Sequence, residues 1–394
     1  MNEKKNVLLT FENYSFSMKK NIFLLLLLFW FSNNLSFSQY HDTSELKFYG
    51  SIRFRAQIDR DSESADKGFL PDTENLKLRF RFGLKYYKKH WKAAARIRTG
   101  NPAYPQNADV ILGSSFTGKE FYIDKAYIQY SNNGFFVWIG KNTLNMWQPD
   151  QILWDVDVNP EGIALKKKFY FQRAGKINLY GGYYIFNNYR MNSNKNPIKN
   201  NSSIFVTQVK YSKFIFNKLH LSIAPGWLHT NFSTADNKFN YQIFMSYVEL
   251  ANLNGNFEII ADFFHNFNNY SKQIEPDFDK QKTGYAFEIK FLPHRKFSTA
   301  LKYAYIEKYA VIDHLSQNDW VRENTKIIDN NNHMVYQYAK ASNFQGINIS
   351  VKYNIVKDIH TKISFWQTQG IKKANSDKEL DSNTRLRWDF IYKF

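Results

Sequence analysis

Apolar and polar side chains alternate along much of this chain, and this period of two constrains the fold more than any other feature. Between 46 and 58, Phe48 and Phe54 belong to an apolar set, and Arg53 and Arg55 belong to the polar set between them. Successive side chains of a β-strand point to opposite faces of the sheet. Such a segment is therefore predicted to be a strand with one apolar and one polar face.

Sixteen segments are read as strands in this way, although the alternation is blurred in 162–169 and 240–250. The predicted strands are 46–58, 76–86, 91–99, 120–130, 134–141, 162–169, 174–186, 203–211, 216–227, 240–250, 255–265, 282–291, 296–306, 342–353, 357–368 and 383–394.

The connections between these strands alternate between long and short. Long connections such as 100–119 and 142–161 are each followed by a tight turn such as 131–133. Outer-membrane barrels have long extracellular loops, short periplasmic turns and an even number of strands. We therefore predict an all-β, up-and-down, antiparallel transmembrane barrel of about 16 strands. A secreted β-sandwich also has alternating strands, but it explains the unequal loops poorly.

The beginning of the chain predicts export. Lys19 and Lys20 precede an apolar run over 22–31, which is about half as long as a membrane-spanning helix, and small residues follow before Gln39. We expect residues 1–38 to be an extension and a cleaved signal peptide, with either Met1 or Met18 as the start. Residues 39–394 would form the barrel, in the outer membrane of a Gram-negative cell.

Charge and cysteine content limit the partners of the exported chain. Without residues 1–38 it has 49 basic and 33 acidic residues, a net charge of +16. This excess favours an anionic partner such as lipopolysaccharide or an anionic solute, and export argues against nucleic acid. There is no Cys, which excludes thiolate metal sites.

The third long connection contains LWDVDVNPEGIAL, in which Asp155, Asp157 and Asn159 alternate as in a calcium loop. Counted from Asp155, positions six and twelve are Pro160 and Lys166, where a calcium loop needs Gly and Glu. We therefore predict no metal and no cofactor. An acid/base pair of aspartates is also disfavoured, because no apolar pocket is evident that would separate their pKa values.

The longer stretch VWIGKNTLNMWQPDQILWDVDVNPEGIAL resembles the putative porin family of Bacteroidota-type outer membranes. Parts of the pattern are shared with alginate-export and phosphate-selective porin barrels. The residues that carry the resemblance are Gly140, Lys141, Trp154, Asp155, Asp157, Pro160 and Gly162. It implies a passive diffusion channel for small hydrophilic solutes rather than an enzyme. The aromatic last strand ending in Phe394 is similar to the signal that the barrel-assembly machinery recognises.

If the apolar faces meet lipid, the polar faces line the lumen and four neighbouring strands present a basic wall to it. Its members are Arg53, Arg55, Arg79, Arg81, Arg96, Arg98, Arg385 and Arg387. Crowded like charges repel one another unless water or acidic groups screen them. We expect the third long connection to fold inward as a constriction, with Asp150, Trp154, Asp155, Asp157 and Glu161 facing this wall. The alternative is an extracellular loop, with the arginines contacting only lumen water or lipopolysaccharide phosphates.

Other functions stay open at this point. An exporter barrel for an anionic polysaccharide has the same pattern, and a secreted binding module is a further rival. An outer-membrane lipase would need a catalytic set, and His220 with Ser222, or His360 with Ser364, lacks an evident third member. The sequence does not fix the solute, the pore size or the oligomeric state, with a homo-oligomer among the alternatives.

Overall fold

A computed structural model describes most of the chain from Ser44 onward, which forms one unit, Ser44–Phe394. The predicted leader, 1–38, lies outside the described residues. The described ranges are 44–61, 72–102, 105–113, 118–186, 190–191, 197–198, 202–216, 218–231, 240–270, 280–321, 324–328, 334–339, 341–371 and 382–394.

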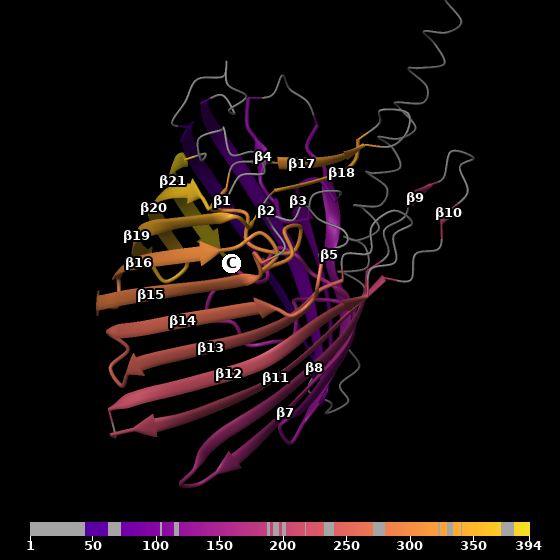
Figure 1. Ribbon diagram of the computed structural model, residues 1–394. Coiled ribbons are helices and arrows are strands. Elements are labelled where there is room, and N and C mark those ends of the chain that lie inside the picture. The colour runs from indigo at the N-terminus through magenta and orange to yellow at the C-terminus, as the bar shows by residue number, and fades with distance from the viewer. Residues whose placement is uncertain are drawn as a thin grey trace, which may run out of the picture. The chain divides into compact units, whose positions relative to one another are not determined.

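Sixteen antiparallel strands of the described residues pair side by side into a closed ring (Figure 1). They are β1 (Ser44–Asp61), β2 (Thr73–Lys88), β3 (Trp91–Thr99), β5 (Phe121–Asn132), β6 (Phe135–Lys141), β7 (Glu161–Phe171), β8 (Gly175–Phe186), β11 (Ser202–Ile215), β12 (Leu219–Asn231), β13 (Gln242–Asn252), β14 (Phe257–Asn266), β15 (Thr283–His294), β16 (Phe297–Ile306), β19 (Phe344–Val356), β20 (Ile359–Gly370) and β21 (Ser382–Lys393). The predicted barrel and its strand number are confirmed.

Five further strands are short. β4 (Val110–Ile111) pairs with β2, β9 (Arg190–Met191) pairs with β10 (Pro197–Ile198), and β17 (Asn324–Ile328) pairs with β18 (Met334–Ala339). No helix in the described part of the chain is long and apolar enough to span a membrane.

The ring closes where the last strand pairs with the first. β21 lies antiparallel to β1, with Phe390 opposite Phe54 and Arg387 opposite Gln57. The backbone amide of Gly50 donates a hydrogen bond to the Phe394 carbonyl over 2.9 Å. Closure satisfies the backbone groups that an edge strand would expose to lipid, where an unpaired group is costly.

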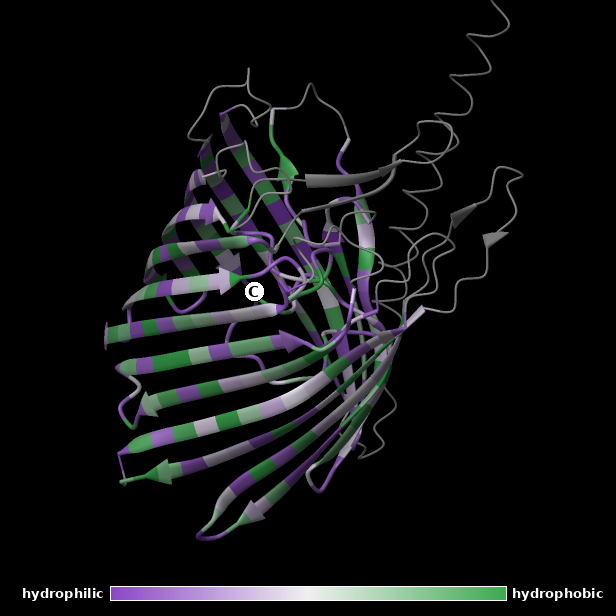
Figure 2. Cartoon of the chain, in the orientation of Figure 1, coloured by the Kyte–Doolittle hydropathy of each residue, from purple (hydrophilic) through white to green (hydrophobic). Residues whose placement is uncertain are grey.

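The outer face of the ring is apolar. Phe48 is 59% exposed and Trp388 is 57% exposed, as expected of side chains that point into hydrocarbon. The strands accordingly carry alternating hydrophobic and hydrophilic bands in Figure 2. The apolar faces of the predicted strands therefore point outward, and the side chains between them point into the lumen.

The inner face differs between the two halves of the ring. Around β1 to β3 it is charged, but on β11 to β16 it includes buried apolar side chains such as Val206, Met245 and Phe264. On β13 both faces carry apolar side chains, such as Met245 inward and Phe244 outward, which explains why the alternation is blurred near 240–250. A uniformly polar lumen, which simple alternation suggests, is therefore wrong for this half of the ring.

Inside the lumen, the apolar half packs against two connecting segments. Residues 142–160 contribute Ile152, Leu153 and Trp154 to one buried cluster, and residues 307–321 contribute Leu315 and Trp320. The two segments also bond to each other, since the Asp155 amide donates to the Leu315 carbonyl over 2.7 Å. The barrel thus contains a small hydrophobic core of its own.

Candidate functional site

The eight arginines of the predicted basic wall lie together on the inner face of β21, β1, β2 and β3. Cross-strand register places Arg53 opposite Arg79 and Arg81 opposite Arg98. Strand pairing thus brings together residues that are up to about 330 positions apart in the sequence.

Carboxylates of neighbouring strands pair with several of these arginines. Arg55 donates from Nε and Nη2 to the two oxygens of Asp389, over 2.6 and 2.9 Å. Arg385 Nε donates to Asp59 over 2.6 Å. Arg96 forms a two-pronged contact with Asp124, at 2.9 and 2.6 Å. Such forked geometry gives strong, directional ion pairs.

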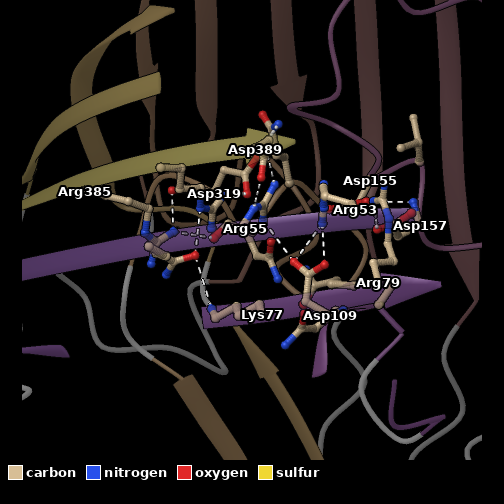
Figure 3. A pocket seen from close by; sticks show the side chains of 18 of the residues that line it. Arg53, Arg55, Lys77, Arg79, Asp109, Asp155, Asp157, Asp319, Arg385 and Asp389 are labelled. Atoms are coloured by element: carbon tan, nitrogen blue, oxygen red, sulfur yellow. Dashed lines mark hydrogen bonds and ion pairs between the residues drawn. The ribbon is translucent and has the colours of Figure 1, made fainter. Parts of the chain in front are cut away.

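Three further carboxylates reach the wall from connecting segments (Figure 3). Asp109, just before β4, accepts from Arg53 over 2.6 and 2.7 Å and from Arg55 over 3.0 Å. Asp319, from the 307–321 segment, pairs with Arg387. The third, Asp157, comes from the 142–160 segment.

Asp157 is shared by three arginines. It pairs with Arg81, and its oxygens lie 3.6 Å from the nearest nitrogens of Arg79 and Arg98. Arg98 Nη1 also donates to the Asp157 backbone carbonyl over 2.9 Å. One aspartate thereby holds the segment against β2 and β3.

The positive wall controls the ionisation of these loop carboxylates. Burial would raise the pKa of Asp157, but the guanidinium groups of Arg81, Arg79 and Arg98 lower it to about 2. The pKa values of Asp109 and Asp319 are likewise held below their ordinary range by neighbouring arginines, against the effect of burial. These three side chains are therefore anionic at neutral pH.

Asp155 has the opposite character. Burial and the adjacent negative charge of Asp157 raise its pKa well above the ordinary value. Its Oδ1 accepts the Asp157 amide over 2.7 Å, and its carbonyl accepts the Val158 amide over 3.0 Å. Trp154 Nε1 donates to the Val158 carbonyl over 2.9 Å, so Trp154 and Asp155 shape the turn that presents Asp157.

The 142–160 segment is also attached to the opposite side of the lumen. Lys302 Nζ on β16 donates to Asp150 Oδ1 over 2.8 Å. Gln208 on β11 exchanges hydrogen bonds with the backbone of Trp147, at 2.8 and 2.9 Å. The segment therefore crosses the lumen from one wall to the other.

Two of the predicted loop residues are placed differently from the expectation. Asp150 faces Lys302 rather than the arginines. Glu161 belongs to β7, where it is 66% exposed on the outer face and pairs with Lys141 over 2.8 Å. The strand begins one residue earlier than expected, so Glu161 follows the outward phase of the alternation and does not face the wall.

The two glycines of the motif mark the entrance and exit of this segment. Gly140 and Gly162 are directly opposite each other on β6 and β7. Gly140 has φ of +122°, which favours glycine, and a Cβ on Gly162 would lie 2.1 Å from the Tyr183 carbonyl oxygen. A side chain at either position would therefore disturb the strands where the chain turns inward.

A cavity of about 590 Å³ remains between the wall and the inward segments. Its charged lining comprises eight cationic side chains, Arg53, Arg55, Lys77, Arg79, Arg81, Lys362, Arg385 and Arg387, and six acidic ones, Asp59, Asp109, Asp155, Asp157, Asp319 and Asp389. The cationic side chains therefore outnumber the acidic ones by two.

Several of these residues were missed by the sequence analysis. Asp59, Asp389, Lys77 and Lys362 share the inward phase of their strands, so the alternation could have identified them. Asp109 and the 307–321 segment carry no comparable signal, because their positions depend on how connecting segments fold inside the ring.

The described part of the chain contains no group of three or more His, Cys, Asp or Glu side chains able to hold a metal ion. Asp157 is instead occupied by arginines. Ser222 Oγ hydrogen-bonds to Ser212 Oγ over 3.1 Å, not to His220.

Solved structures that are similar to this chain include an outer membrane channel. The outer membrane channel DcaP of Acinetobacter baumannii is 12% identical with a TM-score of 0.51, over 91% of this chain and 100% of that one. OpdL of Pseudomonas aeruginosa is 9% identical with a TM-score of 0.48, over 89% and 99%. A loop-deletion mutant of OmpT, an outer membrane protein of Vibrio cholerae, is 10% identical with a TM-score of 0.47, over 90% and 100%.

No curated protein matches the chain. The model of the family described as "Putative porin" matches residues 32–229, which is half of the sequence and includes the motif, most of the basic wall and the whole 142–160 segment. The barrel, its apolar exterior and its charged lumen are those of an outer-membrane channel, and the chain belongs to this porin family.

Proposed function

We propose that this porin is a passive diffusion channel for small hydrophilic solutes, with a preference for anions, and that solutes pass through the cavity beside the basic wall. The observation that carries the proposal is the composition of that cavity, whose cationic side chains outnumber its carboxylates. Charged groups that line a narrow passage set its selectivity.

The lining supports only a moderate preference. Arg55 and Arg385 are neutralised by Asp389 and Asp59. Lys77 Nζ, in contrast, donates to Gln57 Oε1 over 3.1 Å and forms no ion pair with a carboxylate of the described residues. The excess charge available to a solute therefore resides mainly on groups such as Lys77 and Lys362, not on the whole arginine wall.

The inward segments favour small solutes over a polymer. The 142–160 and 307–321 segments pack together across the lumen and bury Trp154 and Trp320. An exporter of an anionic polysaccharide would need a wider passage, or a movement of these segments. A porin for small solutes needs neither.

Assembly and surroundings form a further part of the proposal. The apolar exterior contacts membrane lipid, and lipopolysaccharide would surround its outer half. Phe394 would serve as the signal for the barrel-assembly machinery, as the resemblance implied. A homo-oligomer is compatible with an apolar exterior of this kind, and cross-linking in native membranes would detect it.

Planar-bilayer conductance tests the proposed passage. Deleting residues 148–160 and joining the ends with a short Gly-Ser linker should raise the single-channel conductance severalfold, because the segment that crosses the lumen is removed. Heat-modifiable migration would verify that the variant barrel is folded. A folded variant with unchanged conductance would show that the 142–160 segment does not restrict the passage.

A further inference from the structure

A second basic surface lies away from the arginine wall, near the short turns of β7, β8 and β11. Strand register places Lys168 and Lys210 directly opposite Asn178, one on each side of it. Lys166 lies opposite Tyr180, and Lys176 precedes Asn178 by two residues on the same face of β8. The lysine patch, Lys166, Lys168, Lys176 and Lys210, thus surrounds one buried asparagine on the inner face.

These lysines form no ion pair within the described part of the chain. None of the four ammonium groups has a carboxylate oxygen of the described residues within 4.0 Å. Glu249 lies two strands beyond β11, in the row of Ser212 and Ser222, and its negative charge acts on Lys210 without forming an ion pair with it. Four like charges on adjacent positions of three strands repel one another unless an anion joins them.

Aromatic rings hold three of the ammonium groups in place. Lys210 Nζ lies 3.5 Å from the ring centre of Trp147, which belongs to the inward 142–160 segment. Lys166 Nζ lies 4.7 Å from the Tyr180 ring, and Lys176 Nζ lies 5.3 Å from the Tyr170 ring. A cation–π contact fixes an ammonium group without neutralising its charge.

The patch also has an unused polar group and adjacent space. Asn178 is 4% exposed and its side-chain oxygen has no hydrogen-bond partner among the described residues. Because a carboxamide can turn either its oxygen or its NH₂ group toward a ligand, it can complete an anion site. A cavity of about 400 Å³ lies beside Lys166 and Lys168, bounded by the 131–136 turn and Asn145.

We propose that the lysine patch is a binding site for compact, multiply charged anions, located on the short-turn side of the inward segments. A multiply charged anion can contact several ammonium groups at once, whereas a singly charged one cannot offset the repulsion among four of them. The proposal deepens the proposed channel function, on which its role in transport rests, by naming the class of solute.

Citrate and pyrophosphate are suitable probes, since they are compact polyanions of carboxylate and phosphate type, with acetate at equal ionic strength as the singly charged reference. The current is measured in planar bilayers that contain the full chain, in chloride solution. We expect both polyanions to block it at a lower concentration when they are added on the short-turn side than when they are added on the long-loop side. Block by one polyanion alone would assign the site to carboxylates or to phosphates. Block by acetate at the same concentration would overturn the proposal.

A double variant and a matched control locate the site. Lys168→Gln with Lys210→Gln should raise the half-blocking concentration at least about tenfold, as expected for the loss of two charge-assisted contacts. Lys167→Gln should leave it unchanged, because Lys167 lies between two patch lysines in sequence but has the outward phase and donates to the Asn133 carbonyl.

Binding measured by equilibrium dialysis on the detergent-solubilised protein separates the two proposals. If the channel conducts and the double variant is blocked like the wild type, the lysine patch is not a site and the channel function stands. If the wild type does not conduct but binds citrate or pyrophosphate in a lysine-dependent way, the site stands and the channel function fails.

Discussion

The lumen has two basic regions that differ in how their charge is used. On β21, β1, β2 and β3, arginines meet carboxylates such as Asp157 and Asp389. On β7, β8 and β11, the lysine patch meets aromatic rings and no carboxylate among the described residues. Paired charges attach the inward segments to the wall, whereas charges held by rings remain available to a solute. A count of positive residues would not distinguish these roles.

The largest effect that would test this contrast is a loss of stability in the arginine region. Asp157→Asn should lower the free energy of unfolding by about 3 kcal/mol, because breaking a buried ion pair leaves uncompensated charge. Urea titration in lipid vesicles would measure it. Glu161→Gln, at the exposed pair with Lys141, is the matched control and should cost less than about 1 kcal/mol. Equal losses in both variants would contradict a structural role for Asp157.

Acid should produce a smaller change in the same region. Because the pKa of Asp157 is about 2 in the folded protein and 3.8 ordinarily, its contribution to stability is complete above pH ~4 and is lost as the pH falls toward 2. We expect the 142–160 segment to loosen in this window, with noisier or altered conductance. In the Asp157→Asn variant, the conductance should no longer change over this pH range. A wild-type conductance that is steady from pH 5 to 2 would count against the attachment.

Ion selectivity should show the smallest effect and would sharpen the comparison. Lys77→Gln with Lys362→Gln removes cavity charges that form no ion pair with a carboxylate of the described residues, so reversal potentials in a salt gradient should shift away from anion preference. Arg55→Gln with Asp389→Asn removes one charge of each sign and should leave the potential nearly unchanged. If the second pair shifts it more than the first, the neutralised wall sets selectivity after all.

The sequence predicts the ring well and its contents poorly, and the reason is physical. Alternation reports which face of a strand meets lipid, so Phe48, Trp388 and the arginine positions follow from it directly. For the 142–160 segment, the sequence allows either inward folding or an extracellular loop. Contacts such as the ion pair of Asp157 with Arg81 distinguish the two. These contacts depend on side chains brought together across the lumen, which no local period encodes.

The lysine patch illustrates the same limit. Each lysine follows the inward phase of its strand, but the grouping around Asn178 arises from the relative register of β7, β8 and β11. Register is set by turn geometry and by the burial of whole strand faces, and a shift by one residue would send these side chains to the lipid side. A linear motif for such a site is therefore not to be expected.

The hydrophobic cluster inside the ring has a consequence for how this protein tolerates change. The outward-facing positions of the barrel contact fluid lipid, which accommodates apolar side chains of almost any shape. One apolar residue can therefore replace another there. Inward positions such as Phe264 and Met245 contact a fixed partner of defined contour. The apolar half of the lumen should therefore tolerate changes in side-chain size as poorly as the core of a water-soluble protein does. Shortening one of these side chains would leave a cavity next to the passage beside the basic wall.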